Sequence, residues 1–113
     1  MILGVLLAAG ASQRMGCDKL NLPWRGTTVL DATLAHWTAV PEIDEILLVR
    51  RYSDSRRQQA RVRVLVNLEA DEGMGSSLRL AAMALPSETT AVVVGLADMP
   101  EITAKTISAL IEA

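Results

Sequence analysis

Aromatic residues are scarce in this sequence, making up 3% of its 113 positions and including no Phe. The core must therefore be built from Leu, Val, Ile, Ala and Met, which suit helices packed on a parallel sheet whose strands read as continuous apolar runs. Cysteine is scarce too. The single Cys, Cys17, excludes an internal disulfide and agrees with a reducing compartment.

Long apolar runs and an excess of basic charge are also missing. The longest run, at about 5–9, is far shorter than the ~20 residues of a membrane-spanning helix, so we expect no membrane segment. No basic segment precedes the apolar start of the chain and charged residues follow it at once, which argues for a buried strand of a cytoplasmic protein rather than a signal peptide. The net charge of −2 argues against general nucleic-acid binding.

The chain does have enough apolar residues for one packed domain, since 50% of its positions are hydrophobic and 21% are charged. Apolar runs at 2–8, 43–49, 62–66 and 91–96 predict four buried strands. Apolar spacing predicts helices at 29–40, 75–85 and 103–113, while the polar stretch 50–60 fits either a short helix or a loop. In each helix the spacing places a set of apolar residues on one face: Leu30, Leu34 and Trp37, then Leu78, Ala81 or Ala82, and Leu85, then Ile107, Leu110 and Ile111.

This alternation of strands and helices predicts an α/β fold, with a Rossmann-like, open, mainly parallel sheet and helices on both faces. In such a sheet ligands bind beyond the carboxyl ends of the strands, at the point where the strand order reverses. The residues that follow each predicted strand are therefore the candidates for a functional site.

The first strand leads into a loop that reads Leu7-Ala-Ala-Gly-Ala-Ser-Gln-Arg-Met-Gly-Cys-Asp-Lys19. Gly10 and the alanines around it let backbone N–H groups approach an anion closely, and Arg14 and Lys19 add two positive charges. The loop is neither a Walker loop nor the dinucleotide fingerprint. It predicts a cradle for a triphosphate, with a Gly/Ala-rich turn carrying two solvated basic residues as the structural alternative.

The fourth strand leads into Leu96-Ala-Asp-Met-Pro100, which places one acidic residue, Asp98, directly after an apolar run. A carboxylate at this point can meet a phosphate-bound Mg²⁺. Taken alone, the pattern fits a helix cap better, because Asp followed by Pro is a common way to enter a helix.

The third strand leads into Asn67-Leu-Glu-Ala-Asp-Glu-Gly-Met-Gly-Ser-Ser-Leu78. Two glycines and two serines here open a helix, and the free N–H groups at a helix start can contact a base, a ribose or a phosphate. Ser76 or Ser77 fits the N-cap of that helix equally well. Three segments thus converge on one edge of the predicted sheet.

Together these segments resemble the signatures of the molybdenum cofactor nucleotidyltransferases, in the MobA-like NTP transferase group of the nucleotide-diphospho-sugar transferases. They are most similar to the cytidylyltransferase branch, which has Leu-Ala-Ala-Gly where the guanylyltransferase branch usually has Leu-Ala-Gly-Gly. The resemblance implies that molybdopterin attacks CTP through its terminal phosphate and releases pyrophosphate, with Mg²⁺ as cofactor and a molybdoenzyme as a further partner. A guanylyltransferase, another NTP transferase, and a nucleotide-binding module without turnover remain the alternatives.

The resemblance also implies roles for individual residues. Arg14 would hold the β and γ phosphates, Lys19 would neutralise charge growing on the α-phosphoryl oxygens, and Asp98 would bind Mg²⁺. The implied nucleotide or acceptor contacts are Leu7, Ala8, Ala9, Gly10, Ser12, Asn67, Gly73, Met74 and Ser77. Members of the family are longer, so we expect residues 1–113 to be the nucleotide-binding N-terminal portion, without the acceptor-binding portion. An apolar sheet edge or helix face left exposed in this way would favour self-association.

The remaining polar residues favour structural interpretations. Six of the 11 basic residues fall within 50–63, and a solvated polar connection is a better interpretation of them than a surface for an anionic acceptor or a partner protein. We expect Trp24 to pack between the first loop and the next helix, and His36 to lie at the surface or partly packed. Cys17 is interpreted as a variable loop position.

Overall fold

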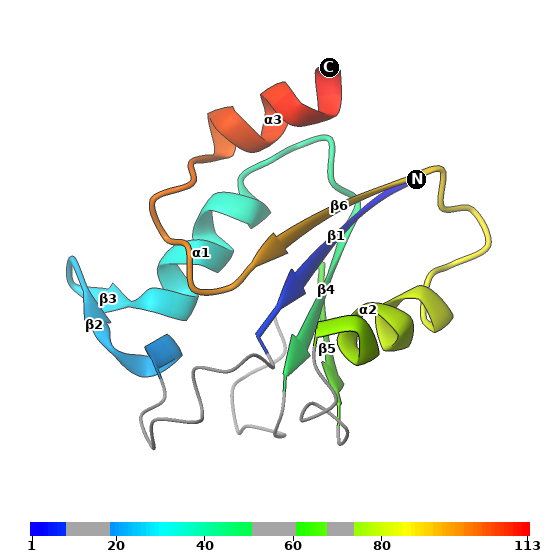
Figure 1. Ribbon diagram of the computed structural model, residues 1–113. Helices are drawn as coiled ribbons and strands as arrows, with labels where there is room; N and C mark the ends of the chain where they lie inside the picture. The colour runs from blue at the N-terminus through cyan, green and yellow to red at the C-terminus, as the bar shows by residue number, and fades with distance from the viewer. Residues whose placement is uncertain (9–18, 51–60, 68–73) are drawn as a thin grey trace.

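The computed structural model describes residues 1–8, 19–50, 61–67 and 74–113. At its centre lies a four-stranded sheet with the order β5-β4-β1-β6, in which every neighbouring pair is parallel (Figure 1). The strands are β1 (Ile2–Leu7), β4 (Glu45–Arg50), β5 (Val62–Val66) and β6 (Ala91–Leu96). The predicted parallel sheet is thereby confirmed, with β4 beginning two residues later than its apolar run.

Helices cover both faces of this sheet, as the alternation predicted. Helices α1 (Val29–Thr38) and α3 (Ala104–Glu112) lie together on one face, and α2 (Met74–Met83) lies on the other (Figure 1). The connection expected at 50–60 lies outside the described residues, apart from Arg50. In the part of the chain that is described, no helix has the length and apolarity needed to cross a membrane.

Side chains alternate between the two faces of the sheet and form two apolar clusters. One, under α1 and α3, includes Leu6, Leu48 and Trp37, while the other, under α2, includes Val5 and Val49. The predicted apolar face of α1 is confirmed, since Leu30, Leu34 and Trp37 all pack into one cluster and are buried.

The apolar faces of the other two helices are only partly covered. Leu110 of α3 is 63% exposed, and the contact of α3 with the core is made by Ile107, with Ile111 partly buried. Leu78 of α2 is also exposed, and Ala81 is the residue that packs under that helix. Helical spacing shows which residues share a face, but the width of the sheet beneath decides how much of that face is covered.

The indole of Trp37 lies against two glycines on adjacent strands. A Cβ atom at Gly4 of β1 would stand 3.1 Å from Trp37 Cε3, and one at Gly95 of β6 would collide with Trp37 Cζ2 and stand 3.0 Å from Cη2. Trp37 itself is 4% exposed. The two glycines therefore make room for the largest side chain of the core. This side chain packs beneath β1 and β6, the two strands whose carboxyl ends form the candidate site.

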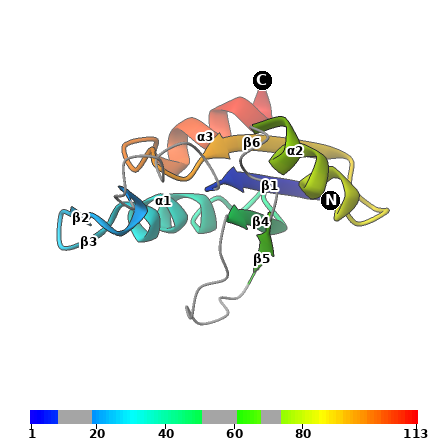
Figure 2. The ribbon, with the colours of Figure 1, turned by 60° about the horizontal axis from the view of Figure 1, so that its bottom comes forward.

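A short hairpin precedes α1 and was not predicted. It consists of β2 (Pro23–Trp24) and β3 (Thr27–Thr28), and it projects away from the sheet (Figure 2). Both turn residues have positive φ, 46° at Arg25 and 86° at Gly26, as a tight two-residue hairpin turn requires. Trp24 is only partly buried and stacks under the Arg25 guanidinium at 5.1 Å, so it belongs to the hairpin.

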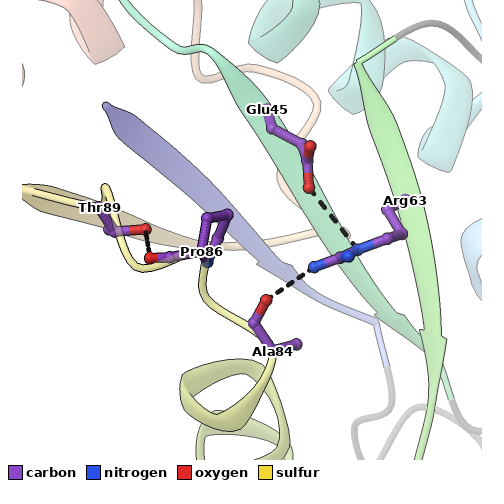
Figure 3. A network of polar contacts seen from close by, with 5 residues as sticks. All are labelled: Glu45, Arg63, Ala84, Pro86 and Thr89. Carbon is purple, nitrogen blue, oxygen red and sulfur yellow. Dashed lines mark hydrogen bonds and ion pairs between the residues drawn. The ribbon is translucent and has the colours of Figure 1, made fainter.

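Two arginines of the basic stretch hold the fold together instead of standing free in solvent. Arg61 donates to the carbonyls of Thr38 at 2.9 Å and Val40 at 3.1 Å, and also to that of Ile43, which closes the end of α1. Arg63 of β5 contacts both the end of α2 and strand β4, as Figure 3 shows. Its Nη2 donates to the carbonyl of Ala84 just past α2 at 2.7 Å, and its Nε lies 3.6 Å from Glu45 Oε1 of β4.

The face of β6 on the α2 side of the sheet is apolar and exposed, as the sequence led us to expect of an apolar sheet edge or helix face. Val92 and Val94 are 40% and 50% exposed, and with Leu78 and Leu85 beside α2 they line an open apolar groove. Among the described residues, strand β6 pairs on one side only, with β1. An uncharged edge strand of this kind offers its free backbone groups to a further strand.

Candidate functional site

The strand order places the candidate site at the carboxyl ends of β1 and β6. From β1 the chain moves to β4 and β5 on one side and then returns to β6 on the other, so the order reverses between β1 and β6. In open α/β sheets the crevice for a ligand forms at such a reversal. The segments that follow β1 and β6 are therefore the first candidates for binding a ligand.

Backbone hydrogen bonds fix the end of β1 from both sides. The N–H of Ala8 donates to the carbonyl of Val49 at 2.7 Å, and the N–H of Ala97 donates to the carbonyl of Leu7 at 3.1 Å. Leu7 and Ala8 are buried, so only their backbone can serve a ligand at this edge. The beginning of the Gly/Ala-rich loop is thus held next to the end of β6.

Asp98 follows Ala97 directly and therefore lies next to the end of β1. It sits in a turn, is exposed, and has no hydrogen-bond or ion-pair partner among the described residues. It does not cap α3, because that helix begins at Ala104 and its N-cap is Thr103, whose hydroxyl accepts from Thr106 N–H at 3.4 Å. The helix-cap alternative for Asp98 is therefore wrong. None of the described contacts gives its carboxylate a structural role.

At the end of β5 the structure joins Asn67 to the start of α2. Asn67 Nδ2 donates to the hydroxyls of Ser76 and Ser77, each at 2.9 Å, and all three side chains are buried. The helix includes Met74, so neither serine is its N-cap and that alternative is also wrong. Met74 is 53% exposed at the helix start.

Lys19 begins η2 (Lys19–Asn21), a short 3-10 helix between the first loop and the hairpin. The next residue, Leu20, is 2% exposed and belongs to the same apolar cluster as Ala8 and Ala97. The backbone that carries Lys19 is therefore anchored in the core close to this edge. The other predicted residues, Ala9, Gly10, Ser12, Arg14 and Gly73, lie outside the described residues, as does Cys17.

Arg50 is a basic residue at this edge that sequence reasoning misplaced. It ends β4, is only 8% exposed, and by strand alternation lies on the α1 face with Leu48. The solvated connection expected of the basic stretch is therefore wrong for Arg50. The available signal was its position directly after an apolar run, the same signal that singled out Asp98.

The carboxylate of Asp98 fits a divalent cation that arrives with a nucleotide. Within the described ranges, no three His, Cys, Asp or Glu residues are grouped so as to hold a metal by themselves. Mg²⁺ usually binds proteins through one or two carboxylates while phosphates and water complete its shell. A single free carboxylate, Asp98, at the end of β6 suits that mode of binding.

Comparison with protein families gives one match that spans nearly the whole chain. Residues 4–113 match the MobA-like NTP transferase domain. Among curated proteins, the chain is 30% identical to the molybdenum cofactor cytidylyltransferase of Escherichia coli K12, over 88% of this chain and 52% of that protein. It is 33% identical to the nicotine blue oxidoreductase of Paenarthrobacter nicotinovorans, over 97% of this chain and 55% of that protein.

Solved structures agree with this assignment. The crystal structure of Rv0371c from Mycobacterium tuberculosis H37Rv superposes with a TM-score of 0.84 at 34% identity, covering 99% of this chain and 59% of the other. The same protein has also been solved in complex with manganese, with a TM-score of 0.76. The chain thus spans little more than half the length of the relatives that it matches. It belongs to the family of MobA-like NTP transferase domains.

Proposed function

We propose that this chain is the nucleotide-binding portion of a nucleotidyltransferase that transfers CMP from CTP to the terminal phosphate of molybdopterin and releases pyrophosphate. One observation carries the proposal. The hydrogen bond from the N–H of Ala97 to the carbonyl of Leu7 holds Asp98 next to the carboxyl end of β1, at the reversal of strand order. The 30% identity to the Escherichia coli cytidylyltransferase supports the choice of CTP and molybdopterin.

The chemistry proposed for this edge consists of holding and charge neutralisation. Phosphoryl-type transfer depends on positioning and electrostatic stabilisation more than on protein nucleophiles. The backbone from Ala8 to Gly10 would hold the nucleotide, and Arg14 would hold its β and γ phosphates. Lys19 would stabilise the charge that develops on the α-phosphoryl oxygens as the acceptor phosphate attacks and pyrophosphate leaves.

Asp98 is the residue proposed to hold Mg²⁺, or another divalent cation, at the nucleotide. A bound cation would draw the phosphate oxygens together and neutralise their charge. The manganese complex of Rv0371c supports the use of a divalent cation by a related protein. The carboxylate of Asp98 is exposed and needs no rearrangement of the fold to accept such a cation.

A nucleotide-binding module without turnover is the second candidate. It is favoured by the lack, among the described residues, of any group of three His, Cys, Asp or Glu that could hold a metal, and by the variety of names among the relatives, which include an oxidoreductase. A guanylyltransferase or another NTP transferase remains the alternative within the same reaction class.

The test is to incubate the chain with Mg²⁺, molybdopterin and each NTP in turn while pyrophosphate release is monitored. We expect release with CTP and loss of that release in Asp98→Asn, which removes the charge and keeps the size of the side chain. Glu88→Gln is the matched control, because Glu88 is an exposed carboxylate at the opposite, amino-terminal edge of the sheet.

The outcomes separate the candidates. Release with GTP but not CTP would contradict the cytidylyl assignment and favour a guanylyltransferase. No pyrophosphate release with any of the four nucleotides, together with measurable binding of CTP, would favour the binding module. The absence of both pyrophosphate release and nucleotide binding would contradict the proposed nucleotide site.

A further inference from the structure

A buried polar cluster ties the sheet to the first turn of α2. The N–H of Asn67 donates to the carbonyl of Arg50 at 2.7 Å, which continues the pairing of β5 with β4 by one residue and fixes the Asn67 backbone. Its side-chain Nδ2 then donates 2.9 Å bonds to Ser76 Oγ and Ser77 Oγ. Asn67, Ser76 and Ser77 are 5%, 7% and 2% exposed, so these bonds form out of contact with bulk solvent.

Both hydrogens of the Asn67 amide are used within this cluster. A side-chain amide has two N–H donors, and each is directed at one serine hydroxyl. Buried polar groups that lose a partner carry a large penalty, so this cluster holds its geometry more firmly than exposed bonds would. Both N–H groups of the Asn67 side chain are thus directed at the serines, which bears on the nucleotide or acceptor contact that the resemblance implies for this residue.

The two serines lie in the part of α2 that matters for an anionic ligand. The first four N–H groups of a helix have no partner within the helix, and the helix start carries partial positive charge. Ser76 and Ser77 belong to this first turn, which begins at Met74. The cluster therefore sets the direction and height of these N–H groups relative to the carboxyl edge of the sheet.

We propose that Asn67 is a positioning residue that acts on the nucleotide through Ser76 and Ser77, by holding the first turn of α2 against the end of β5. This inference rests on the proposed nucleotide site, and it changes the role of Asn67 within that site from a ligand contact to a tether. The distinction is testable because a tether and a contact respond differently when the serines are removed.

The experiment is a double-mutant cycle on the affinity for Mg·CTP, measured by titration calorimetry. The variants are Asn67→Ala, the serine pair Ser76→Ala with Ser77→Ala, and all three together. We expect Asn67→Ala to weaken binding by about tenfold in the original chain, the size of one or two buried hydrogen bonds, and to have no further effect once both serines are gone. An equal loss from Asn67→Ala in both backgrounds would overturn the proposal, because it would mean direct contact with the nucleotide.

Amide hydrogen exchange tests the tether without any nucleotide. Asn67→Ala should accelerate exchange at 74–77 by about tenfold and leave α1 and α3 unchanged. Val40→Ala is the matched control for general destabilisation, because Val40 is fully buried beyond the end of α1, away from this edge. It should lower the melting temperature without selective exchange at 74–77 or loss of affinity.

The two measurements separate failure of the tether from failure of the proposed function. If the original chain binds no nucleotide while Asn67→Ala still loosens 74–77 selectively, the tether stands and the proposed function fails. Unchanged exchange at 74–77 in Asn67→Ala would overturn the tether, whatever the nucleotide data show.

Discussion

Replacing Gly95 by alanine should destabilise the protein, because the space beneath β6 is filled by Trp37. The added methyl group would collide with Trp37 Cζ2 and stand 3.0 Å from Cη2, and the indole is 4% exposed and unable to withdraw into solvent. Adding a methyl group to such a core costs about 2 to 3 kcal/mol. Alanine recovers roughly 0.4 to 1 kcal/mol by restricting the unfolded chain, which leaves a net loss of about 1 to 2.5 kcal/mol.

This loss converts into a measurable shift in the melting temperature. Unfolding entropies of about 2.1 cal/mol/K per residue give roughly 0.24 kcal/mol/K for 113 residues, so Tm should fall by about 4 to 10 °C. Thermal unfolding followed by circular dichroism is the assay. Gly4→Ala is a graded comparison, because its methyl group would stand 3.1 Å from Trp37 Cε3, and its loss should be clearly smaller. Gly75→Ala, which meets nothing within 4 Å, should raise Tm by about 2 to 4 °C.

Measuring Gly95→Ala again in a Trp37→Phe variant tests whether the indole causes the loss. Phenylalanine lacks the second ring of the indole, which is the ring that faces both glycines. In that background Gly95→Ala should lose most of its penalty, because the atoms with which it collides are gone. Equal losses from Gly95→Ala and Gly4→Ala, or an undiminished loss beside Phe, would show that the close packing of Trp37 on β6 does not limit this position.

Three other predictions concern the site, the arginine contacts and the exposed edge. Lys19→Ala and Asp98→Ala should each weaken binding of Mg·CTP, about tenfold or more, in calorimetric titrations, and unchanged affinity in both would remove the proposed site. Arg61→Ala should lower the free energy of unfolding by about 1 to 3 kcal/mol in urea titrations, because it removes the guanidinium donors to three carbonyls, of which that of Val40 keeps a second donor in the N–H of Ile43. Arg63→Ala, which loses one such bond and a half-exposed ion pair, should cost less. The chain should self-associate through β6 in sedimentation velocity and become monomeric as Val94→Lys, and equal association of the variant would place the contact elsewhere.

Much of the fold was predictable because buried parallel strands leave an unambiguous pattern. Four apolar runs gave the sheet, and their carboxyl ends gave the edge on which Asp98 and Asn67 were found. The hairpin at Pro23–Trp24 was not predictable in the same way, since strands of two residues are too short for any periodicity. The exposure of Leu110 could not be predicted either, because it depends on where the sheet ends beneath α3.

The individual residues of the candidate site could be predicted from the sequence, but the contacts between them could not. Loop composition singled out Asp98 and the serines near 76, but their structural alternatives could be removed only by seeing where the helices begin. The burial of Arg50 runs against the usual preference of arginine for the surface, so a charged stretch gave no hint of it. The bonds from Asn67 to the two serines join residues nine and ten positions apart, and only the folded chain brings them together.

Nuclear magnetic resonance of the ¹⁵N-labelled chain with Mg·CTP is the most direct test that a nucleotide binds at the carboxyl edge of the sheet. Amide shifts should change most at Ala8, Asn67 and Asp98, which lie at that edge. The amides of Asp44 and Thr90, which donate to the opposite end of the sheet at Ile2 and Met1, should stay where they are. Changes centred on Asp44 and Thr90, or no changes at all at saturating nucleotide, would contradict the proposed site.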